Sequence, residues 1–264
     1  MNRLAYALAL FFTVLTAAFL AVPALMSMLA GVTQIYARGI ASGLTIDWIL
    51  EVWRLYADTI GRSIAIAMMT LVVTLLVGIP LAYAFVVRPS ALTRALNELM
   101  TLPLAVPGLA VALAMLQLYG NIDWFRRSSL FIVAGHVIFT LPFMVRAVAS
   151  TLGAIDIRTL EEGAASLGAG PLRRFLDVVI PAAMPGVLAG SLMVVTLSIG
   201  EFNLTWMLHT PLTKTLPVGL ADSYASMRLE IASAYTLVFF IMIVPLLVAM
   251  QLVARSKSRK GMSA

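Results

Sequence analysis

Six long apolar segments that contain no charged residue limit the fold of this chain more than any other feature. They cover residues 4–32, 63–87, 99–122, 128–145, 178–200 and 231–254. A helix needs about 20 apolar residues to cross the roughly 30 Å of hydrocarbon in a bilayer, and every segment is near or above that length. None shows the period-two alternation of a barrel strand. We therefore predict an all-α polytopic membrane protein with six transmembrane helices.

The composition excludes several other classes of protein. Only 11% of the residues are charged and 61% are hydrophobic, whereas soluble domains carry about 25% charged residues. The 18 Lys and Arg residues outnumber the 12 Asp and Glu residues, but they are scattered between apolar runs and form no stripe that would indicate nucleic-acid binding. The chain has no cysteine, which rules out disulfides, thiol catalysis and thiolate metal sites.

The basic residues predict the orientation of the chain. Arg3 precedes the first apolar segment, and the run Arg255–Lys260 follows the last one. Because cytoplasmic loops are enriched in Lys and Arg, we predict that both termini are cytoplasmic. The first apolar segment is about twice as long as the apolar region of a signal peptide, so we expect an uncleaved first helix.

Three regions follow from this reading. Residues 1–62 form a first transmembrane helix and its outer loop, residues 63–254 form a five-helix core, and residues 255–264 form a basic cytoplasmic tail. Within the outer loop, at about 33–62, Trp48 and Trp53 lie in an amphipathic pattern. This pattern predicts a short helix lying at the outer membrane interface, with contact to an external partner as the alternative.

The only substantial cytoplasmic loop, at 150–177, has the pattern of a short helix followed by a break. Thr159 and Glu162 fit a capping box, with Thr159 as the N-cap. Gly168 is expected to end the helix, and Pro171 to begin the next one.

A helix this short is not stable alone. Leu160, Ala164 and Leu167 form one apolar face about two turns long, and Gly163 weakens the helix by about 1 kcal/mol relative to alanine. Either the protein's own bundle or a partner must therefore hold it. The residues by themselves leave a purely structural role and a docking role equally open.

The spacing in this loop resembles the EAA motif of permease subunits in type I ABC importers. The matching positions are Glu162-Gly163-Ala164, Gly168, Val178 and Ile180-Pro181. Gly163 replaces an alanine of the motif, Val178 an isoleucine and Ile180 a leucine. The resemblance implies the type I ABC importer permease fold, with a cytoplasmic coupling helix between the fourth and fifth transmembrane helices.

The resemblance also implies how the chain works. The coupling residues would be Glu161, Glu162, Gly163, Ala164, Leu167, Gly168, Ala169 and Pro181. They would dock on a cytoplasmic ATPase, present in two copies, with Glu162 facing a basic residue of that partner. The chain would be a non-catalytic subunit: it has no Gly-x-x-x-x-Gly-Lys-[Ser/Thr] loop, so ATP and Mg²⁺ would be bound by the ATPase. A periplasmic or lipid-anchored binding protein would deliver the solute, and the bacterial cytoplasmic (inner) membrane would hold the assembly.

A second stretch narrows the resemblance. Gly200-Glu201-Phe202-Asn203 and Thr215-Leu216-Pro217-Val218 look like the second permease of polyamine-type importers, features shared by iron(III), thiamine and phosphonate importers. This likeness implies a different chain as the second permease subunit. It also implies a small polar or charged solute, such as a polyamine.

Three polar residues fall in or beside the apolar segments. Glu201 interrupts the fifth segment toward its outer end, and buried carboxylates usually face a bundle interior or a cavity, so Glu201 and Asn203 are candidates for the translocation pathway. An interfacial charge or a partner for an outer arginine is the alternative for Glu201, and Asn203 lies on a different helix face. His136 is expected to hydrogen-bond a neighbouring helix rather than to bind a ligand.

Two other functions fit the pattern less well. An intramembrane hydrolase needs a nucleophile with its base or a metal site, and the chain has neither a His-Glu-x-x-His motif nor a cysteine. A secondary transporter or channel that works without an ATPase commonly has several buried ionisable groups and an inverted repeat, and neither is evident here.

Overall fold

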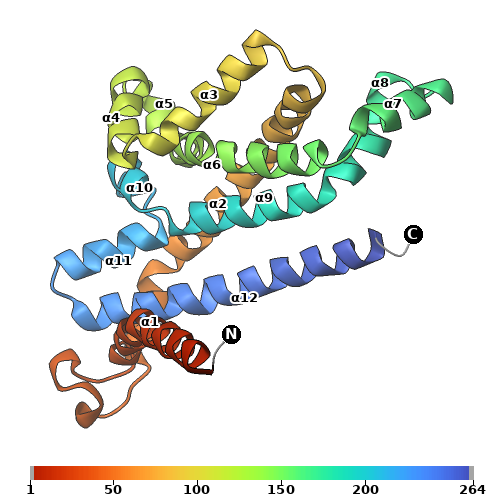
Figure 1. The fold of residues 1–264 in the computed structure, drawn as a ribbon. Helices are drawn as coiled ribbons and strands as arrows, with labels where there is room; N and C mark the ends of the chain where they lie inside the picture. The colour runs from red at the N-terminus through yellow and green to blue at the C-terminus, as the bar shows by residue number, and fades with distance from the viewer. Residues whose placement is uncertain (1–2, 262–264) are drawn as a thin grey trace. The chain divides into compact units, whose positions relative to one another are not determined.

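The computed structural model describes residues 3–261, without the side chains of Leu4, Leu104 and residues 253–261. Apart from one isolated bridge between Thr33 and Leu44, the described residues form helices and loops only, which confirms the all-α prediction. The elements are α1 (Arg3–Ala30), η1 (Tyr36–Ser42), α2 (Asp47–Val87), α3 (Ala91–Ala105), α4 (Gly108–Tyr119), α5 (Asp123–Arg126), α6 (Ser129–Gly153), α7 (Ile157–Ser166), α8 (Pro171–Arg174), η2 (Phe175–Val179), α9 (Ile180–Gly200), α10 (Asn203–Leu208), α11 (Leu216–Ala225) and α12 (Leu229–Gly261) (Figure 1).

Five stretches of helix within residues 3–261 are long and apolar enough to cross a bilayer. They are Ala5–Ala30, Asp47–Val87, Ser129–Gly153, Pro171–Gly200 and Leu229–Leu252. The third predicted segment, 99–122, is instead divided between α3 and α4, which are bent by 106°. A proline disfavours helical backbone at the residue before it, and Val106, which precedes Pro107, is extended. A sixth crossing would require this bent pair to act as one broken span, so the count of six stays a prediction.

The prediction of a separate interfacial helix in the first outer loop is wrong. The helix that holds Trp48 and Trp53 is the beginning of α2, which continues unbroken for 41 residues. At 1.5 Å per residue it is about 60 Å long, roughly twice the thickness of the hydrocarbon layer. Gly61 does not interrupt it, since an isolated glycine inside a helix is only a modest cost.

The predicted basic tail is also part of a helix. The backbone of residues 255–261 continues α12, and residues 262–264 lie outside the described part of the chain.

The chain divides into two compact units. The first comprises Met1–Asp58 and Gly219–Met242. In it Gly31 lies against α12, where a Cβ would come within 2.6 Å of the Ala234 nitrogen. Arg228 donates hydrogen bonds to Glu51 at 2.6 Å and to the Tyr56 hydroxyl at 3.0 Å. These contacts fix the beginning of α12 against the segment that follows α1.

The second unit comprises Thr59–Val218 and Ile243–Ala264, and it holds all the predicted site residues. Its centre is the pair α6 and α9, which lie side by side in Figure 1. The core between them includes Met144, Val148 and Ala183. Small residues let the two backbones approach, as is common between membrane helices: a Cβ on Gly186 would lie 2.5 Å from the Ala147 oxygen.

Candidate coupling and translocation sites

The short helix α7 begins at a different residue from the one predicted. Asp156, not Thr159, is the N-cap: its carboxylate accepts hydrogen bonds from the Thr159 nitrogen at 3.3 Å and the Thr159 hydroxyl at 2.7 Å. Those hydrogen bonds lower the pKa of Asp156. Aspartate is at least as good an N-cap as threonine, and it lies almost one turn earlier, so the longer helix forms. Glu162 is therefore free of any capping role.

The end of α7 is as predicted. Gly168 has a φ of +84°, a conformation that favours glycine. Its nitrogen donates to the Ala165 oxygen at 2.9 Å, and the Ala169 nitrogen donates to the Ala164 oxygen at 3.0 Å. This pair of hydrogen bonds is a Schellman motif, which closes the helix sharply. Pro171 then begins α8, also as predicted.

The two faces of α7 differ in exposure. Ile157 and Glu161 are buried, and Ala164 is half-buried, so these three form the face toward the bundle. Leu160, beside this face, is 49% exposed, and Leu167, just after the helix, is 91% exposed. Glu162 and Gly163 are exposed as well. Two of the three members of the predicted apolar face, Leu160 and Leu167, are thus exposed.

α7 makes two polar contacts with α2 that the sequence did not reveal, one from buried Glu161 and one from exposed Arg158. The Tyr83 hydroxyl lies 2.8 and 2.9 Å from the two carboxylate oxygens of Glu161. Arg158 donates to the Val87 oxygen at 2.6 Å. A pocket of about 610 Å³ opens beside these contacts, lined by Pro80, Tyr83, Val87, Arg88, Arg158, Glu161, Glu162, Pro171, Arg174 and Phe175. No local pattern distinguishes Tyr83 from other aromatic residues near a helix end.

Pro181 lies where the chain enters its long helix. It is exposed and is the second residue of α9, which directly follows the π-helical turn η2. Proline has no N–H to donate to the carbonyl four residues earlier, and a π turn accommodates such a gap in the hydrogen-bond ladder. The motif's proline thus coincides with a local irregularity of the helix.

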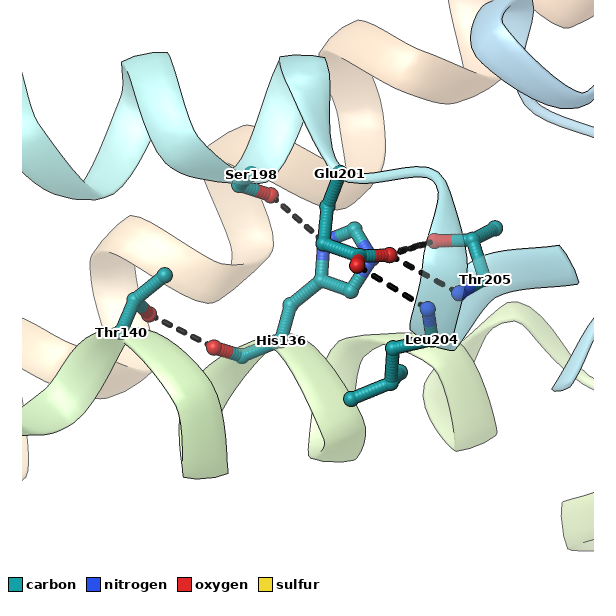
Figure 2. A network of polar contacts seen from close by, with 6 residues as sticks. All are labelled: His136, Thr140, Ser198, Glu201, Leu204 and Thr205. Carbon is teal, nitrogen blue, oxygen red and sulfur yellow. Dashed lines mark hydrogen bonds and ion pairs between the residues drawn. The ribbon is translucent and has the colours of Figure 1, made fainter. Parts of the chain in front are cut away.

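Glu201 lies just beyond the end of α9, which ends at Gly200. Its carboxylate accepts hydrogen bonds from the Leu204 nitrogen at 2.9 Å and from the Thr205 nitrogen and hydroxyl at 2.8 and 2.9 Å (Figure 2). It therefore satisfies two of the backbone N–H groups at the beginning of α10. The side chain is 9% exposed, whereas Asn203 is exposed, so the structure does not bring these two predicted residues together.

His136 bridges α6 to this same corner, which confirms the hydrogen-bonding role predicted for it. Its Nδ1 lies 2.8 Å from the Ser198 hydroxyl, and its Nε2 lies 2.7 Å from the Thr205 hydroxyl (Figure 2). Thr205 has one hydroxyl proton and gives it to Glu201, so it accepts from His136. The neutral ring therefore carries its proton on Nε2 and accepts from Ser198 at Nδ1.

This chain of hydrogen bonds runs from Ser198 through His136 and Thr205 to Glu201. It ties the end of α9 and the beginning of α10 to α6 in a buried setting, where satisfied polar networks hold one arrangement. Glu201, the candidate pathway residue, thus has a carboxylate that accepts three hydrogen bonds from within the chain.

Comparison with known proteins agrees with this architecture. The model of the family described as "Binding-protein-dependent transport system inner membrane component" matches residues 74–259. The molybdenum transport system permease protein ModB of Mycobacterium bovis is 26% identical over 250 residues, covering 86% of this chain and 92% of that protein. The putrescine transport system permease protein PotI of Escherichia coli K12 is 30% identical over 171 residues, covering 61% of this chain and 59% of that one.

A solved structure shows the same fold. It is the crystal structure of a bacterial ABC transporter involved in the import of the acidic polysaccharide alginate. The match has a TM-score of 0.70 at 16% identity and covers 98% of this chain and 96% of that chain. The fold is therefore that of type I ABC importer permeases. The chain belongs to the binding-protein-dependent transport system inner membrane components, the permease subunits of ABC importers.

Proposed function

We propose that this chain forms half of a solute translocation pathway and is driven by a separate ATPase that binds α7. The observation that carries the proposal is the form of α7 itself. Asp156 caps its beginning, Gly168 closes its end, and its outer face leaves Leu160 and Leu167 exposed. A ten-residue helix fixed at both ends with an uncovered apolar face is suited to docking.

The residues of the docking surface follow from their exposure. The exposed residues that a partner can reach are Leu160, Glu162, Gly163 and Leu167, and apart from the local helix backbone no atom lies within 4 Å of a Cβ placed on Gly163. A partner can therefore approach the helix backbone closely at that point. Glu162 supplies a carboxylate for a basic residue of the ATPase.

The proposed assembly has the composition that the family resemblance implies. Two ATPase subunits bind ATP and Mg²⁺, a second permease subunit of a different chain completes the pathway, and a periplasmic or lipid-anchored binding protein delivers the solute. With both termini in the cytoplasm of a bacterial cell, α7 is on the ATPase side of the inner membrane. When two ATPase subunits close on ATP, α7 moves with them and the bundle changes from inward-facing to outward-facing.

We propose a small polar or charged solute. Relatives are described as transporting molybdenum and putrescine, an oxyanion-forming element and a polyamine. The carboxylate of Glu201 accepts three hydrogen bonds from the beginning of α10, a role that does not depend on the charge of the solute. Selection by the binding protein explains how similar permeases serve such different solutes. Calorimetry of that binding protein with molybdate, polyamines, phosphonates, iron and thiamine identifies the solute.

The substitution Glu162→Lys tests the docking surface. It reverses the charge of an exposed side chain, so membrane insertion is expected to persist while the ATPase fails to copurify and transport is lost. Glu98→Lys makes the same change at another exposed position, on α3, and is the matched control. Normal copurification of the ATPase with Glu162→Lys contradicts the proposal.

A further inference from the structure

Tyr83 connects three elements of the second unit. From its place near the C-terminal end of α2 it donates to the Glu161 carboxylate of α7, at 2.8 and 2.9 Å from the two oxygens. Its ring also meets Phe175 of η2 edge-on, with 5.5 Å between the ring centroids. The motif residues of the loop do not include Tyr83, and Glu161 lies one residue before the motif begins.

A second hydrogen bond joins the same two helices. Arg158 donates to the oxygen of Val87, the last residue of α2, at 2.6 Å. The final carbonyls of a helix have no partner within it, so this contact supplies one. Arg158 and Glu161 are three residues apart and therefore lie on the same side of α7. One side of α7 is thus bonded to α2 at two points, one turn apart.

The chemistry of the Tyr83–Glu161 contact makes it a firm connection. Glu161 is only 8% exposed, and hydrogen bonds to a carboxylate are shorter and stronger than those between neutral groups. Removing the phenolic hydroxyl would leave a buried carboxylate with one donor fewer, which is costly. Leu160 and Leu167 of the same loop are exposed.

We infer that the Tyr83–Glu161 hydrogen bond is a mechanical joint that transmits movement of α7 directly to α2. The chain itself links α7 only to α6 and α8, and the Arg158–Val87 hydrogen bond is exposed to water, so the part-buried Tyr83–Glu161 joint is the firmer of the two contacts that add a third helix to the set that moves. Glu161 is then a positioning residue that acts inward on Tyr83, whereas Glu162 acts outward on the ATPase. The inference rests on the proposed function, because an ATPase must move α7 for the joint to transmit anything.

Spin labels on the two helices test the joint. The chain has no cysteine, so Ser166→Cys on α7 and Leu76→Cys on α2, both exposed, label it specifically. Distances between the labels are measured by pulsed electron paramagnetic resonance in the assembled transporter in lipid, with the cysteines of its partners replaced. Spectra are compared without nucleotide and with ATP and vanadate. With Tyr83 present, the distance is expected to be the same in both states because the helices move together.

Tyr83→Phe removes one oxygen atom and keeps the ring contact with Phe175. It is expected to retain the nucleotide-free distance, which also shows that the variant is folded, and to shift that distance when ATP and vanadate are added. Glu161→Gln keeps a carbonyl acceptor for Tyr83 and is expected to behave as the parent, whereas Glu161→Ala is expected to behave as Tyr83→Phe. Combining Tyr83→Phe with Glu161→Ala is expected to add nothing to either change alone.

Two results would overturn the joint: a Tyr83→Phe distance that ATP leaves unchanged, or a Glu161→Gln variant that shifts as much as Glu161→Ala. Failure of the proposed function is seen separately, as a parent complex in which the ATPase makes no contact with α7.

Discussion

Gly186 on α9 lies so close to the Ala147 carbonyl on α6 that a Cβ at position 186 would come within 2.5 Å of that oxygen. The Thr151 hydroxyl would be equally close. Backbone cannot move aside as a flexible side chain does, so this glycine sets the spacing of the central helix pair. It belongs to the packing of the bundle rather than to the docking surface.

Gly186→Ala is expected to lower the free energy of unfolding by about 1–3 kcal/mol, the usual cost of overpacking a core. Gly200→Ala is the control, because nothing lies within 4 Å of a Cβ at that position. Thermal unfolding of the purified protein in detergent measures both. Equal melting temperatures for the two variants would show that α6 and α9 are not packed this closely.

His136→Ala is expected to destabilise the fold by about 1–3 kcal/mol, because the buried hydroxyls of Ser198 and Thr205 lose their shared partner. His209→Ala is the matched control, since the His209 ring makes local contacts with Trp206, three residues earlier: Nδ1 lies 2.8 Å from the Trp206 oxygen, and the two ring centroids are 5.6 Å apart. Chemical or thermal unfolding of the two variants is compared. A His136→Ala protein as stable as the control would mean that the hydrogen-bonded chain contributes nothing.

Glu201→Ala is expected to cost about 0.5–2 kcal/mol, the usual effect of losing a side chain that caps a helix. The backbone N–H groups of Leu204 and Thr205 donate to the Glu201 carboxylate, so hydrogen exchange at those two amides is expected to become faster in the variant. Glu201→Gln keeps one oxygen acceptor, so its stability is expected to lie between that of the parent protein and that of Glu201→Ala. If Glu201 also lines the pathway, Glu201→Gln alters uptake without loss of assembly; unchanged uptake kinetics would leave the cap as its only role.

Two glycines of the coupling loop are expected to respond in opposite ways to alanine. Gly163 lies inside α7 with open space around it, so Gly163→Ala stabilises the helix by up to about 1 kcal/mol. Gly168 has positive φ, so Gly168→Ala costs about 1–2 kcal/mol and loosens the end of the helix. Hydrogen exchange across α7 measures both effects. If both variants changed the rate of hydrogen exchange in the same direction, the Schellman motif at Gly168 would be contradicted.

The features that could be predicted from the sequence are those with a local signal. Long charge-free segments predict the helices, Gly168 predicts where α7 ends, and Pro171 predicts where α8 begins. The prediction of Thr159 as the N-cap of α7 is wrong because Asp156 and Thr159 both suit that position, and only the contacts of the folded loop decide between them. Pro107 indicates a break between α3 and α4, but the angle between these two helices depends on packing.

The contacts between distant segments could not be predicted. Tyr83 and Glu161 are 78 positions apart, and neither has a neighbour pattern that identifies the other. His136 and Ser198 are 62 positions apart and likewise show no pattern that pairs them, so the chain of hydrogen bonds that ends at Glu201 could not be predicted. Local patterns fix helices, but the partners of buried polar groups are set by the tertiary fold.

The contact between α7 and the ATPase is tested most directly by a site-specific cross-link from Leu167, which is 91% exposed. A photo-reactive residue at position 167 is illuminated in membranes that contain the whole transporter, and the product is identified by mass spectrometry. Position 212, where Leu212 is 78% exposed in the loop after α10, is the control. The account predicts a product with the ATPase from position 167 and none from position 212; no ATPase product from position 167, or equal yields from both positions, would contradict it.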